Sequence, residues 1–302
     1  MVNFLTGALL SFLNCIGELF YGQITTDFKP CLRFFYKETI PQGISGDSYV
    51  ALCQLYNDEY RFATLYDKSR RIPLYSAYIL RAKVQGGGSR TRKESWKVQP
   101  ELDNPGKIPM ASRDDEKHEK LENSQAVNED YTNSGYSRGH LAPSGHQETD
   151  DDRKATFTLT NIVPQKEGSN TGTWEAQEQK MLKRLKDCTS RMYVITGVMP
   201  YESNEPKINN RVHVPEYMWT AYCCESFKGE ADQNHFPTYA AVGRNDQNSP
   251  EDIVKKDPNN KGYDVKEMSL ESLEKILKER LKMSKLSLFK DQCKSDKSKT
   301  HH

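Results

Sequence analysis

The chain has 302 residues, enough for one large domain or two small ones with a sizeable core. Its 43 lysine and arginine residues face 42 aspartate and glutamate residues, so the formal charge is +1 and no global basic field attracts nucleic acid. This balance disfavours a structural nucleic-acid binder, which would have to neutralise many phosphates. The same charge balance is weaker evidence against an enzyme, in which a metal ion and a few arginines contact the one phosphate that is cleaved.

Residues 1–22 form the one strongly apolar run, and no later stretch approaches transmembrane length. We interpret this run as a signal peptide cleaved near Gly22. Its first residues lack lysine and arginine, and Glu18 interrupts it, so a buried first helix and an uncleaved anchor are the alternatives. The sequence therefore predicts a secreted protein without stable membrane insertion. The domain would span residues 23–293, followed by a charged tail over 294–302.

Cysteine usage agrees with export. Removal of Cys15 with the signal leaves an even number of cysteines, which in an exported chain indicates disulfides. No Cys-x-x-Cys pair is present, which argues against a structural zinc site. Adjacent Cys223 and Cys224 would point to opposite faces of a strand and so bond to different partners. Fifteen pairings are open to the six residues, which are Cys31, Cys53, Cys188, Cys223, Cys224 and Cys293.

The first third of the chain predicts a β-hairpin followed by exposed segments. Residues 60–66 and 72–84 have strand composition, and residues 67–70 make the turn between them. The glycine-rich basic segment 85–93 is expected to be a solvated loop rather than a nucleic-acid contact. The charged run 113–122 is expected to be an exposed loop that precedes the active-site strand.

Residues 136–146 bring together side chains suited to phosphodiester chemistry. His140 can act as a base, because the unperturbed pKa of histidine lies near physiological pH. Arg138 can hold a phosphate oxygen with its planar guanidinium group. His146 does not have a helical zinc spacing from His140, and we expect it on the wall of a cleft or at the surface.

Two segments then lead to the second motif. Asp150, Asp151 and Asp152 are expected to form a solvated cap for residues 153–155, because consecutive carboxylates cannot converge on one ion without sharp turns. Residues 156–163 alternate as a strand that leads into Pro164 and Gln165.

Asn170, Trp174 and Glu178 follow at four-residue steps, which would place them on one broad face of a helix. Asn170 offers a neutral carbonyl oxygen suited to Mg²⁺, an ion that keeps several of its waters, and Glu178 can hold one of those waters. Considered without the other motif, Asn170 is more readily interpreted as a helix N-cap than as a metal ligand. Trp174 is expected to pack in the protein interior under both interpretations. Lys183 and Arg184 make the same helix basic, either as a solvated face or as phosphate contacts.

The rest of the chain predicts core strands and a closing helix. Residues 191–197 and 212–224 have the composition of buried strands, with His213 in a structural role. Residues 238–242 are the apolar part of a polar, loop-rich segment. Ser269 is expected to begin a helix. The apolar stripe of this helix consists of Leu270, Leu273, Ile276, Leu277 and Leu281.

The sequences Ser137-Arg-Gly-His140, Thr156-Phe-Thr-Leu-Thr-Asn161-Ile-Val-Pro-Gln165 and Asn170…Trp174…Glu178 resemble those of the DNA/RNA non-specific endonucleases. The resemblance is closest to the endonuclease domain-containing 1 group and covers roughly residues 25–293. It implies an α+β fold in which helices flank a central antiparallel sheet. It also implies a ββα-metal (His-Me finger) active site.

This resemblance implies a role for each residue of the motifs. His140 would be the general base, Arg138 a phosphate and transition-state contact, and Asn170 the direct protein ligand of Mg²⁺, with Mn²⁺ or another divalent cation as the alternative. Glu178 would be an outer-shell carboxylate. The residues that would support the site are Ser137, Asn161 and Trp174.

The sequence departs from the family pattern at two positions. Ser137 stands where the family usually has aspartate, although some mitochondrial members also have serine there. Leu182 stands where some bacterial members have a further phosphate-binding arginine, for which Lys183 or Arg184 can compensate.

We therefore expect a secreted, Mg²⁺-dependent endonuclease that hydrolyses DNA and/or RNA without base specificity and leaves 5′-phosphate ends. The alternative is a nuclease-fold binding protein with weak or no catalysis, as the serine at position 137 would suggest. A third reading is a phosphodiesterase for small nucleotides. The sequence leaves open the choice between DNA and RNA, the disulfide pairing, the oligomeric state and the physiological role.

Overall fold

The computed structural model describes residues 24–25, 27–81, 95–103, 110–112, 121–250 and 253–294. The predicted signal peptide and the basic loop over 85–93 lie outside the described residues. So do residues 113–120 of the charged run and the tail beyond Lys294.

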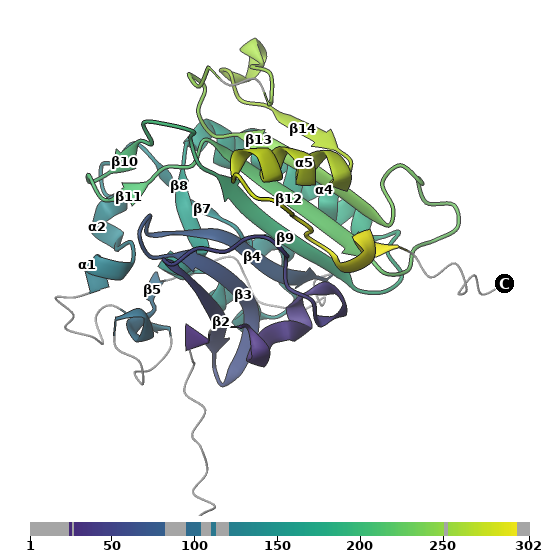
Figure 1. Cartoon of the computed structure of the whole chain (residues 1–302), viewed down its shortest axis with the longest axis horizontal. Helices are drawn as coiled ribbons and strands as arrows, with labels where there is room; N and C mark the ends of the chain where they lie inside the picture. Colours follow the sequence, from purple (N-terminus) through teal and green to yellow (C-terminus); the bar gives the residue numbers. More distant parts are fainter. Residues whose placement is uncertain are drawn as a thin grey trace, which may run out of the picture.

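An eight-stranded antiparallel sheet forms the centre of the molecule (Figure 1). Its order is β1-β2-β3-β4-β9-β12-β13-β14, and every neighbouring pair is antiparallel. The expected α+β fold with a central antiparallel sheet is therefore confirmed. The strands are β1 (Ile24–Thr25), β2 (Tyr49–Tyr56), β3 (Glu59–Asp67), β4 (Ile72–Leu80), β9 (Met192–Met199), β12 (Tyr217–Cys224), β13 (Thr238–Arg244) and β14 (Val265–Met268).

Five α-helices and three small strand pairs surround the sheet in the described part of the chain. The helices are α1 (Leu121–Ser124), α2 (Asn128–Tyr131), α3 (Asp150–Ala155), α4 (Glu175–Leu185) and α5 (Leu270–Arg280). The strand pairs are β5 (Lys97–Val98) with β6 (Ala111–Ser112), β7 (Ser137–His140) with β8 (Ile162–Gln165), and β10 (Lys207–Ile208) with β11 (Val212–His213). None of the described helices is long and apolar enough to cross a bilayer.

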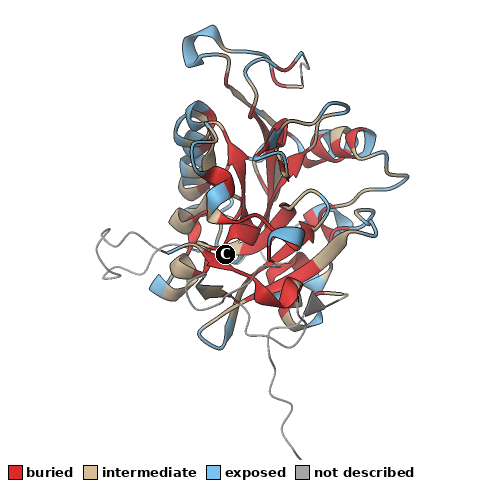
Figure 2. Cartoon of the chain, turned by 90° about the vertical axis from the view of Figure 1, so that its left-hand side faces the viewer, coloured by how far each residue is buried: buried red, intermediate tan, exposed pale blue. Residues whose placement is uncertain are grey.

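Both faces of the central strands are covered. Side chains of β12 alternate between two layers: Trp219 packs with Leu273 of α5, whereas Tyr222 packs with Met181 of α4. The two helices therefore lie on opposite faces of the sheet, and Figure 2 shows the strands buried between the outer elements. Every residue of β9 and β12 is buried as a result.

The predicted hairpin and closing helix are confirmed. β3 and β4 pair antiparallel around the turn after Asp67. Ser269 is the N-cap of α5, where its hydroxyl accepts a hydrogen bond from the backbone N–H of Ser272 at 3.2 Å. In α3, Thr149 is the N-cap and the three aspartates form the first turn, so their carboxylates meet the positive end of the helix.

Three strand predictions need correction. Residues 156–161 do not form a strand. Thr158 has an extended backbone but makes an isolated bridge with Lys97, and Leu159–Asn161 forms a 3-10 turn. The buried hydroxyls of Thr158 and Thr160 bond to Lys97 and Gln54. The strand β8 begins only at Ile162. Strand β9 runs beyond Gly197 to Met199. The predicted strand over 212–224 is two strands, since Pro215 interrupts the segment and has no N–H to donate.

The six cysteines of the described chain form three disulfides: Cys31–Cys53, Cys188–Cys224 and Cys223–Cys293. Cys223 lies in the layer under α5 and Cys224 in the layer under α4. The prediction that these neighbours face opposite ways and have different partners is confirmed.

Candidate active site

Strands β7 and β8 and the helix that follows them form a ββα unit on one face of the sheet. Ser137 pairs with Gln165 and His140 with Ile162 in an antiparallel register. A π-helical turn, η7 (Ser169–Trp174), then leads into α4. The expected ββα arrangement is therefore present.

Gly139 allows the two strands to approach closely. A Cβ atom at this position would lie 2.2 Å from Oε1 and 2.7 Å from Cβ of Gln165, which is fully buried. The Gln165 amide nitrogen donates to the hydroxyl of Ser169 at 3.1 Å, which joins the strand pair to the start of η7. Glycine at position 139 is thus required by packing in the middle of the motif.

Asn161 fixes the chain that leaves β7. Its carbonyl oxygen accepts from the backbone N–H of Ala142 at 3.0 Å and from the hydroxyl of Ser76 at 2.9 Å. Its amide nitrogen donates to the carbonyl oxygens of Ala142 and Thr156, both at 3.0 Å. With four bonds and no exposed surface, Asn161 supports the loop after His140 rather than meeting a ligand.

The amide of Asn170 is oriented by Ser137. The Ser137 hydroxyl lies 2.8 Å from the Gln165 carbonyl oxygen. Because a carbonyl oxygen can only accept, the hydroxyl donates its one proton to this bond. It must then accept from Asn170, whose amide nitrogen lies 3.0 Å away. This chemistry sets the orientation of the amide and turns the Asn170 carbonyl oxygen away from Ser137.

Asn170 does not cap a helix. The N-cap position of η7 is Gly168, and Asn170 lies within the turn, with its backbone N–H bonded to the Lys166 carbonyl oxygen at 2.9 Å. Within the described part of the chain, no hydrogen bond uses the Asn170 carbonyl oxygen. A half-buried neutral oxygen held in this way is a suitable hard ligand for Mg²⁺.

His140 is enclosed by aromatic rings. The ring of Trp96 lies 5.4 Å from the imidazole and that of Phe157 lies 5.1 Å from it, centroid to centroid. Nε2 of His140 is buried and has no hydrogen-bond partner among the described residues. This burial lowers the pKa of His140 to about 4, so the ring is neutral at physiological pH and its ordinary pKa does not apply.

Arg138 lies on the same side of β7 as His140 and shares its aromatic neighbour. Its guanidinium group lies 5.4 Å from the Trp96 ring centroid and 5.1 Å from that of Tyr131. Nη2 donates to the backbone and side-chain oxygens of Asn128, both at 3.2 Å, while the buried Nε has no partner in the described chain. Burial lowers the pKa of Arg138 somewhat, although arginine keeps its charge.

The sequence reasoning missed Trp96 as part of the site. The hydrogen bond between the Lys97 N–H and the Phe157 carbonyl oxygen, at 2.9 Å, brings the segment before β5 against the loop before β8. This pairing joins residues that are about sixty positions apart, and no local pattern around Trp96 signals it. Phe157, in contrast, lies within one of the motifs that carry the family resemblance.

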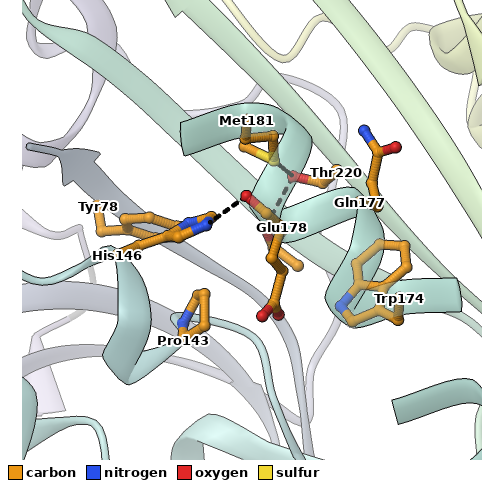
Figure 3. A pocket seen from close by; sticks show the side chains of 9 residues that line it. Tyr78, Pro143, His146, Trp174, Gln177, Glu178, Met181 and Thr220 are labelled. Carbon is orange, nitrogen blue, oxygen red and sulfur yellow. Dashed lines mark hydrogen bonds between the residues drawn. The ribbon is translucent and has the colours of Figure 1, made fainter. Parts of the chain in front are cut away.

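Glu178 projects from the first turn of α4 into a small pocket that its neighbours His146, Pro143 and Trp174 also line. Figure 3 shows its carboxyl group extending toward the space between Pro143 and Trp174. Burial, with a smaller contribution from the charge of Glu175, raises the pKa of Glu178 to about 8. Trp174 is buried, and its ring fills the space over Gly243, where a Cβ atom would lie 2.6 Å from the indole. The expectation that Trp174 packs is confirmed.

The two basic residues further along α4 have different surroundings. Arg184 bonds to Glu267 of β14 at 2.8 Å and lies 4.8 Å from the ring centroid of Tyr239. Lys183 is exposed. In the described structure the contacts of Arg184 are made with the edge of the sheet, not with His140 or Asn170.

The described residues contain no group of three histidine, cysteine, aspartate or glutamate side chains that could hold a metal ion. The aspartates of α3 instead contact Asn57 and Arg61, at 3.0 Å from Asp151 and 3.1 Å from Asp152. A cation at the ββα unit would therefore depend on few protein atoms and on its own waters, as the free carbonyl oxygen of Asn170 allows.

Comparison with known proteins gives a consistent result. A family model for DNA/RNA non-specific endonucleases matches residues 53–278. The Endonuclease domain-containing 1 proteins of Homo sapiens and Mus musculus are 33% and 30% identical over 226 residues, which are 72% of this chain and 43% of each relative. The mitochondrial nuclease EXOG of Mus musculus is 29% identical over 150 residues, covering 47% of this chain and 34% of that protein. The chain thus matches less than half of the length of these relatives.

Among solved structures, a chain of the EndoG/EndoGI complex has a TM-score of 0.50 and 19% identity, covering 83% of this chain and 88% of that chain. This likeness supports the fold.

Proposed function

This chain belongs to the DNA/RNA non-specific endonuclease family, and from that premise we propose that it is a secreted endonuclease that needs a divalent cation, Mg²⁺ in the first place. The substrate would be DNA or RNA. The observation that carries this proposal is the bond from Asn170 to Ser137, which orients the Asn170 carbonyl oxygen on the same ββα unit that carries a neutral histidine.

Asn170 would hold the cation, and the cation, when bound, would neutralise charge on the phosphate and on the leaving oxygen. Nε2 of His140 would take the proton of the attacking water, because this buried nitrogen has no other partner in the described structure and stays unprotonated at neutral pH. The water oxygen would bond to phosphorus as the bond to the 3′ oxygen breaks. The released 3′ oxygen would take a proton from another water of the site, so that the products would be a 5′-phosphate and a 3′-hydroxyl.

Arg138 and Glu178 would act around this step. Arg138 would exchange its bonds to the Asn128 oxygens for bonds to phosphate oxygens, which are stronger acceptors for a guanidinium group. Glu178 would hold a water at the edge of the site. These contacts involve the sugar–phosphate backbone and carry no base information, so we expect little base specificity.

The disulfides support the secreted location. All six cysteines of the described chain are paired, and such bonds persist in oxidising compartments. Secretion would give the enzyme extracellular nucleic acid as its substrate.

A plasmid-nicking assay tests the proposal. Supercoiled DNA and a structured RNA are each incubated with the purified chain in Mg²⁺, with and without EDTA, beside the His140→Ala and Asn170→Ala variants. We expect cleavage that EDTA abolishes, loss of cleavage in His140→Ala, and a higher Mg²⁺ requirement in Asn170→Ala. EDTA-resistant cleavage, or residual activity of His140→Ala within a few fold of the parent, would contradict the proposal.

A second function has one observation in its favour. Trp96 covers both His140 and Arg138, so a nucleic acid could bind at the rim without reaching the base. A binding protein of this kind would shift in an electrophoretic mobility assay and leave the plasmid intact in Mg²⁺ and in Mn²⁺.

A further inference from the structure

His146 is buried at the end of the short turn Ser144–His146, six residues after His140. Its Nδ1 lies 2.9 Å from the hydroxyl of Tyr78 on β4, and its Nε2 lies 3.1 Å from the backbone oxygen of Glu178 on α4. Figure 3 shows the imidazole between the Tyr78 side and the helix, with a hydrogen bond to the Glu178 backbone. The ring therefore links the sheet, the loop after the candidate base and the helix of the site.

The two partners define the tautomer of this ring. A backbone carbonyl oxygen only accepts hydrogen bonds, so Nε2 must carry the proton. In a neutral imidazole the other nitrogen is then an acceptor, and Nδ1 accepts from the hydroxyl of Tyr78. Tyr78 is fully buried, and burial raises its pKa well above the ordinary value, so the hydroxyl keeps its proton.

The first turn of α4, which contains Glu178, is preceded by an irregular segment. The preceding η7 is a π-helical turn, and Gly172 within it has φ −117° and ψ −108°, outside helical values. The buried polar atoms Nε1 of Trp174 and Oε1 of Gln177, which flank Glu178, have no partners among the described residues. If the helical register shifted by one residue in η7, Glu178 would rotate by about 100° around the axis of α4. The bond from His146 opposes that rotation.

We propose that His146 is a positioning residue that holds the backbone of Glu178, and with it the start of α4, in a fixed place relative to the loop that follows His140. The catalytic consequence rests on the proposed nuclease function. His146 would set where the Glu178 carboxylate lies relative to His140 and Asn170 without touching substrate.

Two substitutions of His146 test its hydrogen bonds to Glu178 and to Tyr78 one at a time. His146→Gln can place an amide N–H near the position of Nε2 and keep the bond to the Glu178 carbonyl oxygen. His146→Asn can place an amide group near the position of Nδ1 and keep a bond to Tyr78, but it is too short to reach α4. His213→Asn is the matched control, since His213 pairs with Glu205 on another part of the molecule.

With the full chain in saturating Mg²⁺, we expect His146→Gln to keep kcat within about three-fold of the parent. We expect His146→Asn to lower kcat by roughly ten-fold at a similar KM, a barrier difference in the range that misplacement produces. His213→Asn should match the parent. Equal kcat values for the Asn, Gln and parent proteins would overturn the proposal. If His146→Asn fails to fold, Tyr78→Phe decides together with His146→Gln, because both lose the contact between Tyr78 and Nδ1 and keep a donor to the Glu178 carbonyl oxygen. A kcat within about three-fold of the parent in both supports the proposal, and a roughly ten-fold loss in both contradicts it.

A readout without catalysis distinguishes this inference from the proposed function. Side-chain ¹⁵N–¹H NMR at neutral pH should show His146 protonated at Nε2 and unprotonated at Nδ1. The opposite tautomer, or an imidazolium ring, would overturn the inference whether or not the protein cleaves DNA. A parent that fails to cleave while showing the expected tautomer would contradict the nuclease function and leave the positional role of His146 in place.

Discussion

The hydroxyl of Ser137 donates to the Gln165 carbonyl oxygen and accepts from the Asn170 amide, and it makes no hydrogen bond with His140 in the described structure. Neighbouring residues of β7 point to opposite sides, which places Arg138 and His140 together beside Trp96 and Ser137 away from them. An aspartate at position 137 could also accept from Asn170 but could not donate to Gln165. The serine therefore orients Asn170, the proposed metal ligand, and does not hydrogen-bond to the histidine within the described part of the chain.

Substitution of Ser137 should change the cation requirement. Ser137→Ala removes the acceptor that orients Asn170, and the loss of one neutral hydrogen bond of about 1 kcal/mol should raise the Mg²⁺ concentration for half-maximal cleavage by roughly five-fold. Ser137→Asp adds a negative charge near the cation and should lower that concentration, with a change in rate of about ten-fold or less. Mg²⁺ titrations of both variants test this. An alanine variant whose titration overlays that of the parent would show that Ser137 does not orient the ligand.

The raised pKa of Glu178 predicts proton release on cation binding. Without a cation the carboxyl group is largely protonated below its pKa of about 8. A nearby cation favours the carboxylate, so Mg²⁺ binding should expel a proton at pH 7, and the affinity for Mg²⁺ should rise with pH until about pH 8. Calorimetric titration in two buffers of different ionisation enthalpy measures the released proton. Glu178→Gln should abolish the release, and a parent that releases no proton would contradict a role for Glu178 near the cation.

At the level of the elements, the ββα placement of the candidate site residues could be predicted from short motifs, because their side chains lie on two local units. Ser137, Arg138 and His140 share one strand, and Asn170 lies on the turn that follows its partner strand. Regular elements with strong periodicity, such as α5, were predicted for the same reason.

Features that depend on distant contacts could not be predicted. Residues 156–161 alternate like a strand, but their alternation comes from hydroxyls that bond to Lys97 and Gln54. The four-residue spacing from Asn170 to Glu178 suggests a regular helix, whereas the structure has a π-helical turn at its start. The enclosure of His140 by Trp96 needs the pairing of Lys97 with the Phe157 segment, which no local propensity encodes.

The close approach of β7 and β8 gives a prediction for this strand pair. Gly139→Ala would place a Cβ atom against the buried side chain of Gln165, so the pair must separate or Gln165 must move. We expect a loss of stability of about 1–3 kcal/mol, as for other overpacked sites, and a loss of most activity. Gly145→Ala is the matched control, because a Cβ atom there has no neighbour within 4 Å in the described structure. Equal urea midpoints for the two variants would rule out the packing requirement at Gly139.

For the whole molecule, the disulfides attach outer elements to the two faces of one central strand. Cys188 follows α4, which carries Glu178, and its bond to Cys224 fixes the far end of that helix to β12. Cys223 faces the other way and bonds to Cys293, which anchors the last described turn of the chain under α5. The two bonds start from adjacent residues, yet only one belongs to the face with the site.

Removal of Cys188–Cys224 and removal of Cys223–Cys293 should therefore lower the free energy of unfolding by similar amounts but change the activity to different extents. The bonds close sequence separations of 36 and 70 residues, for which the chain-entropy model gives about 4 kcal/mol each. We expect the double variants Cys188→Ala/Cys224→Ala and Cys223→Ala/Cys293→Ala to lose similar amounts of unfolding free energy in urea. At a temperature where both remain folded, only the first should lose activity, by roughly three- to ten-fold, because the end of α4 is released while β12 stays in place. A measured kcat that falls equally in both variants would show that the disulfides act on the sheet as a whole and not on the helix of the site.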